Sequence, residues 1–444
     1  MTNILSLSAL LVAATLLLPF GQSRLVGKPP TDASTHTFRE AATGLLMHEN
    51  LVKEHRVAAS QYHEVTFVIQ QRNMDEMKSI LYDISDPESD NYGKHLTREE
   101  VADRTANPDS RDAVVAYLET FGATVVSETP HGEYIIAQAP VSLWEKMFDT
   151  EFFAYTVLPP ENLRKIKTDK NVIKIIRAEK YSVPTCLDSH IESVLSVIQM
   201  PSMHSRKVSP LPFTSASIKS LDFSAEDWEG YVTPALLKRV YNVDTDVSHN
   251  KATQAVFELY QDSYSKKDIE QFQDTFNLPR LAVNISIGNY TASQSYCADK
   301  FYECAESNLD LQYIMAMSPS PTTHYHSDVG LSSYWLFVVS SATNVPKVIS
   351  ISWGYLEKYA TMSEMNAFNK EALKLGVMGT TILVATGDDG VASDEARYDN
   401  TKCAYNPDFP STSEYVTAVG ATMVRTKLTL FFLDVFIYDN NIAA

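Results

Sequence analysis

The stretch Thr380-Thr-Ile-Leu-Val-Ala-Thr-Gly-Asp-Asp-Gly390 predicts a buried β-strand that runs straight into a tight turn. Its first seven residues are apolar or β-branched, which is typical of a parallel strand covered on both faces. Side chains just beyond the carboxyl ends of parallel strands line the ligand crevice, so Asp388 in the turn is a candidate site residue. An aspartate that merely caps the turn backbone is the alternative interpretation.

Strand and helix patterns alternate on both sides of this stretch, which predicts an α/β fold with a parallel sheet between two layers of helices. Ser352-Trp-Gly354 follows another predicted strand and falls at the same edge of the sheet. The other strands are expected at 254–260, 322–326, 347–352 and 415–419, and the helices at 265–276, 305–317, 331–342 and 362–375.

Glu306 and Asp310 lie four residues apart in the predicted helix 305–317. A rotation of about 100° per residue brings both carboxyl groups onto one face of the helix. Acidic pairs at this spacing often form a solvated face. Here the face is the more apolar one, since Met317 shares it and Asn308 lies opposite. Two carboxyls in such surroundings should have pKa values that are pushed apart, which suits acid and base chemistry.

The first half of the chain predicts a smaller α+β unit of the split ferredoxin-like kind. Strands are expected near 65–69, 123–126, 133–137 and 151–155, with helices at 74–82, 109–121 and 142–148. Residues 186–230 then change in composition: Ser, Pro and Met are enriched, and Arg206-Lys207 is a basic pair. We expect a linker there, either a processing site or a plain tether.

Several features predict passage through the secretory pathway. Residues 1–23 have the apolar run of a cleaved signal peptide, which is shorter than the ~20 apolar residues of a membrane span. Asn284 and Asn289 begin glycosylation sequons. Four cysteines suit an oxidising compartment and allow three pairings, of which Cys297–Cys304 closes the shortest loop. The other two are Cys186 and Cys403.

Charge restricts the classes of partner. The formal net charge of −18 argues against nucleic acid and against anionic membrane surfaces, because both are bound by positive patches. The apolar stretch 428–437 near the carboxyl end is too short for a membrane span and contains Asp434. An acidic compartment fits this composition, since carboxylates there are partly protonated and repel one another less.

Taken together, these motifs resemble the sedolisins, the serine-carboxyl peptidase proenzymes of the tripeptidyl-peptidase type. The resemblance covers about residues 60–424, with matching stretches in the same order along the chain. These stretches are Ser85–Val101, Val232–Asn242, Glu306–Asp310, Ala385–Gly390 and Phe409–Thr422.

The resemblance implies a subtilisin-like α/β peptidase domain at 231–424 behind an inhibitory activation prodomain at 24–185, with autocatalytic activation at acid pH. It implies that Glu306 is the general base for a serine nucleophile, that Asp310 orients Glu306, and that Asp388 stabilises the oxyanion. Peptides or proteins would be the substrates, in an extracellular, lysosomal or vacuolar setting. A carboxylate base suits acid pH, where a histidine would be protonated.

The sequence departs from the family pattern after residue 424. No Gly-Thr-Ser nucleophile motif follows Asp388, and residues 425–444 do not resemble the family. Calcium is expected from the resemblance, but the family's site of Asp side chains and backbone carbonyls is absent from this chain. We therefore expect the chain as written to form no acyl-enzyme.

Two other functions are considered. One is a non-catalytic binding protein whose prodomain inhibits an intact paralogue. The other is a glycosidase that uses Glu306 and Asp310. Glycosidase carboxyls flank the sugar from opposite sides, which residues on adjacent helical turns cannot do.

Overall fold

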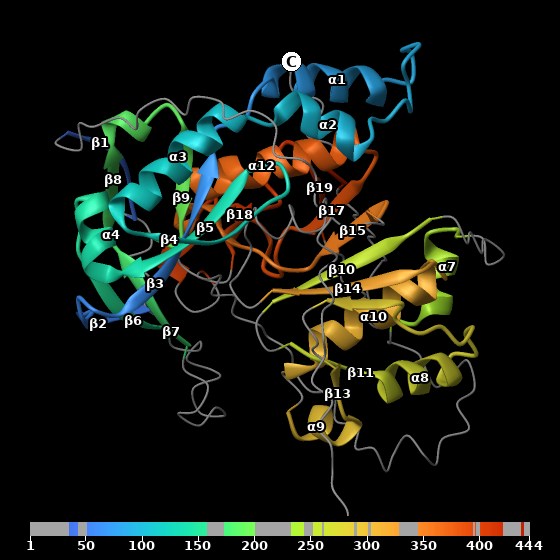
Figure 1. The fold of residues 1–444 in the computed structure, drawn as a ribbon. Coiled ribbons are helices and arrows are strands. Elements are labelled where there is room, and N and C mark those ends of the chain that lie inside the picture. The colour runs from blue at the N-terminus through green and yellow to red at the C-terminus, as the bar shows by residue number, and fades with distance from the viewer. Residues whose placement is uncertain are drawn as a thin grey trace, which may run out of the picture.

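The computed structural model describes residues 35–42, 51–157, 173–199, 232–243, 252–259, 262–287, 291–300, 303–327, 345–393, 396, 400–420 and 437–438. The predicted signal peptide, the helix at 331–342, the basic pair of the linker and nearly all of the 425–444 tail lie outside these residues. In Figure 1 the N-terminal unit, blue to green, lies beside helix α12 of the C-terminal unit, which runs from yellow to red.

A sheet of seven strands forms the centre of the C-terminal unit in the part of the chain that the structure describes. All neighbouring strands are parallel except the last pair, so the predicted α/β class is confirmed at this level. The order across the sheet is β12 (Ile285–Ile287), β14 (Thr322–Ser327), β10 (Gln254–Leu259), β15 (Val348–Ile351), β17 (Thr381–Ala385), β19 (Thr417–Val419) and β20 (Ile437–Tyr438).

Side chains of β10 alternate between two buried clusters, as the two-residue period of a strand requires. Phe257 packs in the cluster on the side of helix α12 (Met362–Val377). Val256 packs in the cluster formed with α8 (Lys266–Thr275) and α10 (Ala305–Met317). Each fully buried large apolar side chain contributes about 1.5–3 kcal/mol. The sheet is therefore covered on both faces, and α10 is fixed on one of them.

The N-terminal unit has a four-stranded antiparallel sheet in the order β4 (Thr124–Glu128), β5 (Tyr134–Pro140), β3 (Tyr62–Ile69) and β9 (Ile191–Leu195). Helices α3 (Pro108–Phe121) and α4 (Val141–Phe148) contribute to its core. Trp144 and Phe148 stack with ring centroids 5.6 Å apart inside that core. Aromatic burial of this kind dominates the packing energy of a small domain.

Two sequence-based expectations for this unit are wrong. The predicted strand near 151–155 is present as β6 (Phe152–Val157), but it pairs with β2 (Leu51–Arg56) and β7 (Ile173–Ala178) in a separate sheet instead of joining the predicted ferredoxin-like one. The fourth place in the main sheet is taken by β9, so residues 186–199 are not linker. Buried apolar side chains hold this segment in the core, as Val194 illustrates.

Smaller elements complete the described fold. They are β1 (His36–Ala41) with β8 (Lys180–Pro184), β11 (Tyr264–Ser265) with β13 (Thr291–Ala292), β16 (Tyr355–Leu356) with β18 (Asp408–Phe409), and the helices α1 (Met74–Ser85), α2 (Arg98–Thr105), α7 (Pro234–Val240) and α9 (Gln294–Asp299). Within the ranges given above, no helix combines the length and the apolar character that crossing a membrane requires.

The two units meet along α12 through a buried polar network. Lys374 Nζ donates to Glu371 Oε1 at 3.1 Å and lies 3.9 Å from Glu133 of the N-terminal unit. Tyr134 OH, also from that unit, donates to Glu371 Oε1 at 3.0 Å. Burial raises the pKa of Glu371. The N-terminal unit therefore packs against the C-terminal unit of the same chain. The buried charges of Lys374, Glu371 and Glu133 compensate one another at this contact.

Candidate active site

Helix α10 carries both predicted carboxylates, and its boundaries follow from the sequence. It begins after Cys304 and ends at Met317, where Ser318 precedes a proline and is extended. Two residues of the helix itself, Leu311 and Met315, are buried in the core. This anchoring fixes the helix rotation, so Glu306 and Asp310 are both half-buried on its inner side.

The centre of the site is Glu258, a fully buried carboxyl group on strand β10. Burial raises its pKa well above the ordinary value, and the nearby carboxylates of Asp310, Asp262 and Glu306 raise that pKa further. Trp353 Nε1 donates a hydrogen bond to Glu258 Oε2 at 3.0 Å, which acts in the opposite direction. We call Glu258, Asp262, Glu306 and Asp310 the acid cluster.

Sequence reasoning found only half of the acid cluster. Glu258 ends the apolar run of a buried strand, and an acidic residue in such a run is the signal that could have revealed it. Trp353 lies in the Ser352-Trp-Gly354 motif at a strand end, but the sequence does not indicate its bond to Glu258. Asp262 lies in the loop after β10, where nothing in the sequence distinguishes it.

Strand register places Asp388 at the same edge of the sheet. Phe257 pairs with Ile351 and Ile351 with Val384, so β10, β15 and β17 end together. Asp388 follows β17 with an exposed side chain. Among the described residues, the carboxylates that act on Glu258 do not include Asp388. The structure therefore brings Glu306 and Asp310 together at Glu258 and leaves Asp388 in the adjoining turn.

Strand β18 packs closely against the residues that follow β15 and β17 at this edge of the sheet. Gly387 has φ +83°, and Asp408 occupies the space that a Cβ at Gly387 would need. A Cβ on Gly354 would lie 2.9 Å from the carbonyl oxygen of Phe409. The backbone contact leaves no room for a Cβ at Gly354, whereas at Gly387 the positive φ is what favours glycine, since the Asp408 side chain can move.

No group of three or more His, Cys, Asp or Glu side chains in the described part of the chain is arranged to hold a metal ion. Calcium stays a prediction from the resemblance alone.

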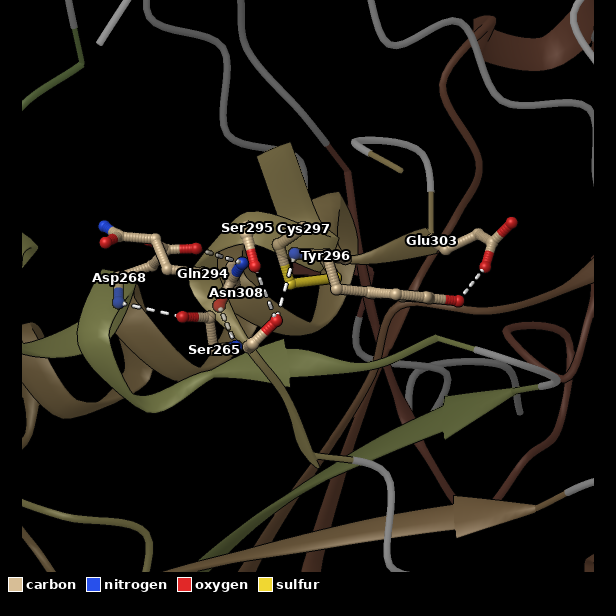
Figure 2. The surroundings of a disulfide bond; sticks show 10 residues. Ser265, Asp268, Gln294, Ser295, Tyr296, Cys297, Glu303 and Asn308 are labelled. Carbon is tan, nitrogen blue, oxygen red and sulfur yellow. Dashed lines mark hydrogen bonds between the residues drawn. A yellow bond between two sulfur atoms is a disulfide. The ribbon is translucent and has the colours of Figure 1, made fainter. Parts of the chain in front are cut away.

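Cysteines 297 and 304 form a disulfide, which confirms the pairing that closes the shortest loop. Cys304 is the residue immediately before α10. The site helix therefore starts at a covalent crosslink (Figure 2).

Comparison with known proteins gives a consistent picture. Residues 49–200 match the family described as "Pro-kumamolisin, activation domain". Physarolisin of Physarum polycephalum is 28% identical over 385 residues, which is 82% of this chain and 60% of that protein. Tripeptidyl-peptidase 1 of Dictyostelium discoideum is 27% identical over 82% of this chain and 62% of its own length.

The human protein named tripeptidyl-peptidase 1 is 25% identical over 81% of this chain and 61% of its own length. The chain thus spans about three fifths of the length of these relatives. A solved Pseudomonas sedolisin is 22% identical, with 45% of this chain and 55% of that one covered at a TM-score of 0.35. That TM-score adds nothing to the fold described above.

Proposed function

The chain belongs to the sedolisin family of serine-type peptidases, and we propose that Glu306 and Asp310 supply its acid–base chemistry for peptide-bond hydrolysis. The observation that carries this proposal is the acid cluster, in which both residues act on the buried Glu258. Acid–base chemistry is expected at carboxyl groups with perturbed pKa values that lie at the carboxyl edge of a parallel sheet.

In the proposed mechanism Glu306 accepts the proton of an attacking serine hydroxyl and later returns it to the leaving amine. It lies in the first turn of α10, where the helix dipole favours the anionic form that a base requires. Asp310, one turn further on, orients Glu306. Burial raises the pKa of Glu258 and so favours its neutral form, which lowers the repulsion that an ionised Glu306 meets in the cluster.

Asp388 is proposed to donate a hydrogen bond, while protonated, to the oxyanion that forms when the peptide carbonyl is attacked. The turn at Gly387 presents it beyond the end of β17. Because the side chains that transfer protons in this mechanism are carboxyls, the mechanism suits an acidic compartment.

The 444 residues contain no Gly-Thr-Ser motif, and we propose that this chain alone hydrolyses no peptide. Assays of an unblocked tripeptide substrate from pH 3 to 8 are expected to show no turnover. Turnover at acid pH that is lost on Glu306→Gln would contradict this proposal, with Glu119→Gln as an exposed control.

The role of Glu306 is tested by joining residues 1–424 to the part of physarolisin that follows its matched region. The chimera is expected to cleave the tripeptide at acid pH and to lose at least ~100-fold in kcat on Glu306→Gln, with Glu119→Gln unaffected. A folded chimera that is inactive, or one that is indifferent to Glu306→Gln, rejects the assignment.

A second candidate function is inhibition of an intact family member by the N-terminal unit. Its support is that residues 51–157 and 173–199 contribute a hydrophobic core of their own and contact α12 across a buried polar network. Residues 24–226, produced alone, are then expected to inhibit an intact tripeptidyl-peptidase at neutral pH. Absence of inhibition at micromolar concentration rejects this function.

Passage through the secretory pathway to an extracellular, lysosomal or vacuolar destination is also proposed. The Cys297–Cys304 disulfide supports it, because disulfides persist in oxidising compartments. Asn284 is exposed immediately before edge strand β12, as a glycosylated asparagine must be. Peptides or proteins would be the substrates, and release of the N-terminal unit at acid pH would activate the enzyme.

A further inference from the structure

The first turn of α10 lacks the side-chain cap that usually holds a helix N-terminus. Its N-cap residue, Cys304, makes no side-chain capping hydrogen bond. Uncapped first turns fray because their backbone N–H groups have no partner within the helix. Glu306, the second residue of the helix, lies in this turn. The position of the proposed base therefore depends on whatever else holds the helix start.

The disulfide, instead of a side-chain cap, anchors the start of α10. Cys304 and Cys297 are both buried, and Cys297 belongs to α9. Helix α9 has its own cap, since Ser293 Oγ accepts from the backbone N–H of Tyr296 at 3.1 Å. The crosslink therefore ties the uncapped start of α10 to a short helix that is capped (Figure 2).

The loop that carries Asp262 is fastened to the same point. The backbone N–H of Ser263 donates to the carbonyl of Glu303 at 2.7 Å, and that of Ser265 donates to Asn308 Oδ1 at 3.0 Å. Tyr296 OH donates to the Glu303 carboxylate, which ties α9 to the residue before Cys304. Two members of the acid cluster, Asp262 and Glu306, thus depend on one crosslinked segment.

We propose that the Cys297–Cys304 disulfide is a positioning element of the site, which holds Glu306 and Asp262 in the acid cluster by fixing the first turn of α10. This inference rests on the proposed function, since it concerns how that same base is placed. Asp310 belongs to the next turn, which Leu311 and Met315 anchor in the core. Opening the disulfide therefore displaces Glu306 and spares Asp310.

The decisive experiment is hydrogen exchange on the full 444-residue chain and on its Cys297→Ala/Cys304→Ala variant. The amide of Asn308, whose N–H donates to the carbonyl of Cys304, is expected to exchange at least about fivefold faster in the variant, with those of 314–317 unchanged. Cys403→Ser is the control, because this exposed cysteine lies outside the disulfide. Unchanged exchange at Asn308 overturns the proposal.

A rescue variant separates positioning from general support. Cys297→Ala/Cys304→Ser places at the N-cap a hydroxyl that can accept from the first turn. It is expected to restore much of the slow exchange at Asn308. If both variants lose the whole fold by circular dichroism, or if the serine restores nothing, the disulfide has a different role and the proposal is wrong.

Trp353 fluorescence provides a second readout that needs no peptidase activity. Trp353 bonds to Glu258, which also faces Asp262, Glu306 and Asp310, so its emission should follow the protonation of this cluster. Subtracting the signal of Trp353→Phe isolates it. In the alanine variant the midpoint is expected to fall by about one pH unit, because Glu306 leaves the cluster.

An unchanged midpoint contradicts the inference. Inactivity of the physarolisin chimera would reject the proposed function but would leave both of these readouts intact. The two ideas can therefore fail separately.

Discussion

The indole of Trp353 and the carboxyl of Glu258 are joined by a hydrogen bond of 3.0 Å at the carboxyl edge of the parallel sheet. Trp353 comes from the segment after β15, and Glu258 from β10, the next strand in the sheet. The bond satisfies one oxygen of a carboxyl group that is otherwise costly to bury. It also fixes the group around which Glu306 and Asp310 are arranged.

Removing this donor should destabilise the fold. Trp353→Phe is expected to lower the free energy of unfolding by about 1–3 kcal/mol, because a buried acceptor loses its partner. Urea denaturation at pH 5 measures the loss. Glu258→Gln keeps an acceptor for the indole and should cost less than Trp353→Phe at that pH. A larger loss for Glu258→Gln would contradict this interpretation.

Glu364 on α12 predicts that part of the stability is lost as pH rises. Burial raises the pKa of Glu364 to about 8. A carboxyl with a raised folded pKa contributes its full stability below the unfolded pKa near 4.5 and loses that contribution as pH rises through about 8. Glu364→Gln should remove a decline of roughly 3–5 kcal/mol between these limits. Urea midpoints at pH 4.5, 6 and 8 test this, and an unaltered slope in the variant would contradict it.

His63, in the N-terminal unit, predicts the opposite pH dependence, a loss of stability as pH falls. Burial and the charge of Arg177 lower its pKa to about 4, while a hydrogen bond with the Ser196 carbonyl acts in the other direction. The neutral form is therefore favoured, and the corresponding stability is lost as pH falls from about 6.5 to about 4.

His63→Gln keeps a donor for Ser196 but does not titrate. It should abolish an acid-induced loss of about 3 kcal/mol in the N-terminal unit. Limited proteolysis between pH 7 and 4 reports on this unit. Equal acid sensitivity of both proteins would show that His63 is not responsible.

The buried lysine between the two units should matter more than an exposed one. Lys374→Met leaves Glu371 and Glu133 without their cation and is expected to cost about 3–5 kcal/mol at pH 7. Lys78→Met removes an exposed bridge to Glu414 between the same two units and should cost less than ~1 kcal/mol. Thermal denaturation compares the two variants. Equal losses of stability in Lys374→Met and Lys78→Met would contradict this prediction.

Much of the C-terminal unit was predictable because its apolar runs are long and regular. Helix α10 spans the predicted residues 305–317, and the strands around Phe257, Ile351 and Val384 are parallel as predicted. The i, i+4 spacing placed Glu306 and Asp310 on one side correctly. These features depend on local sequence and on the burial of a continuous sheet.

What the sequence did not reveal depends on tertiary contacts. Val194 lies in a segment whose composition resembles a linker, yet it is buried because β9 pairs with β3. The pKa of Glu258 is raised by burial and by carboxylates that come from helix α10 and from a loop, which the sequence of β10 alone does not show.

The most direct test of the central claim is a carboxyl ¹³C NMR titration of the full chain, with Glu258 assigned through Glu258→Gln. We predict that Glu258 titrates well above its ordinary range, and that Glu306→Gln and Asp310→Asn each lower its midpoint by about one pH unit. A Glu258 midpoint near 4.5 that neither substitution moves would show that these carboxyls do not form one cluster.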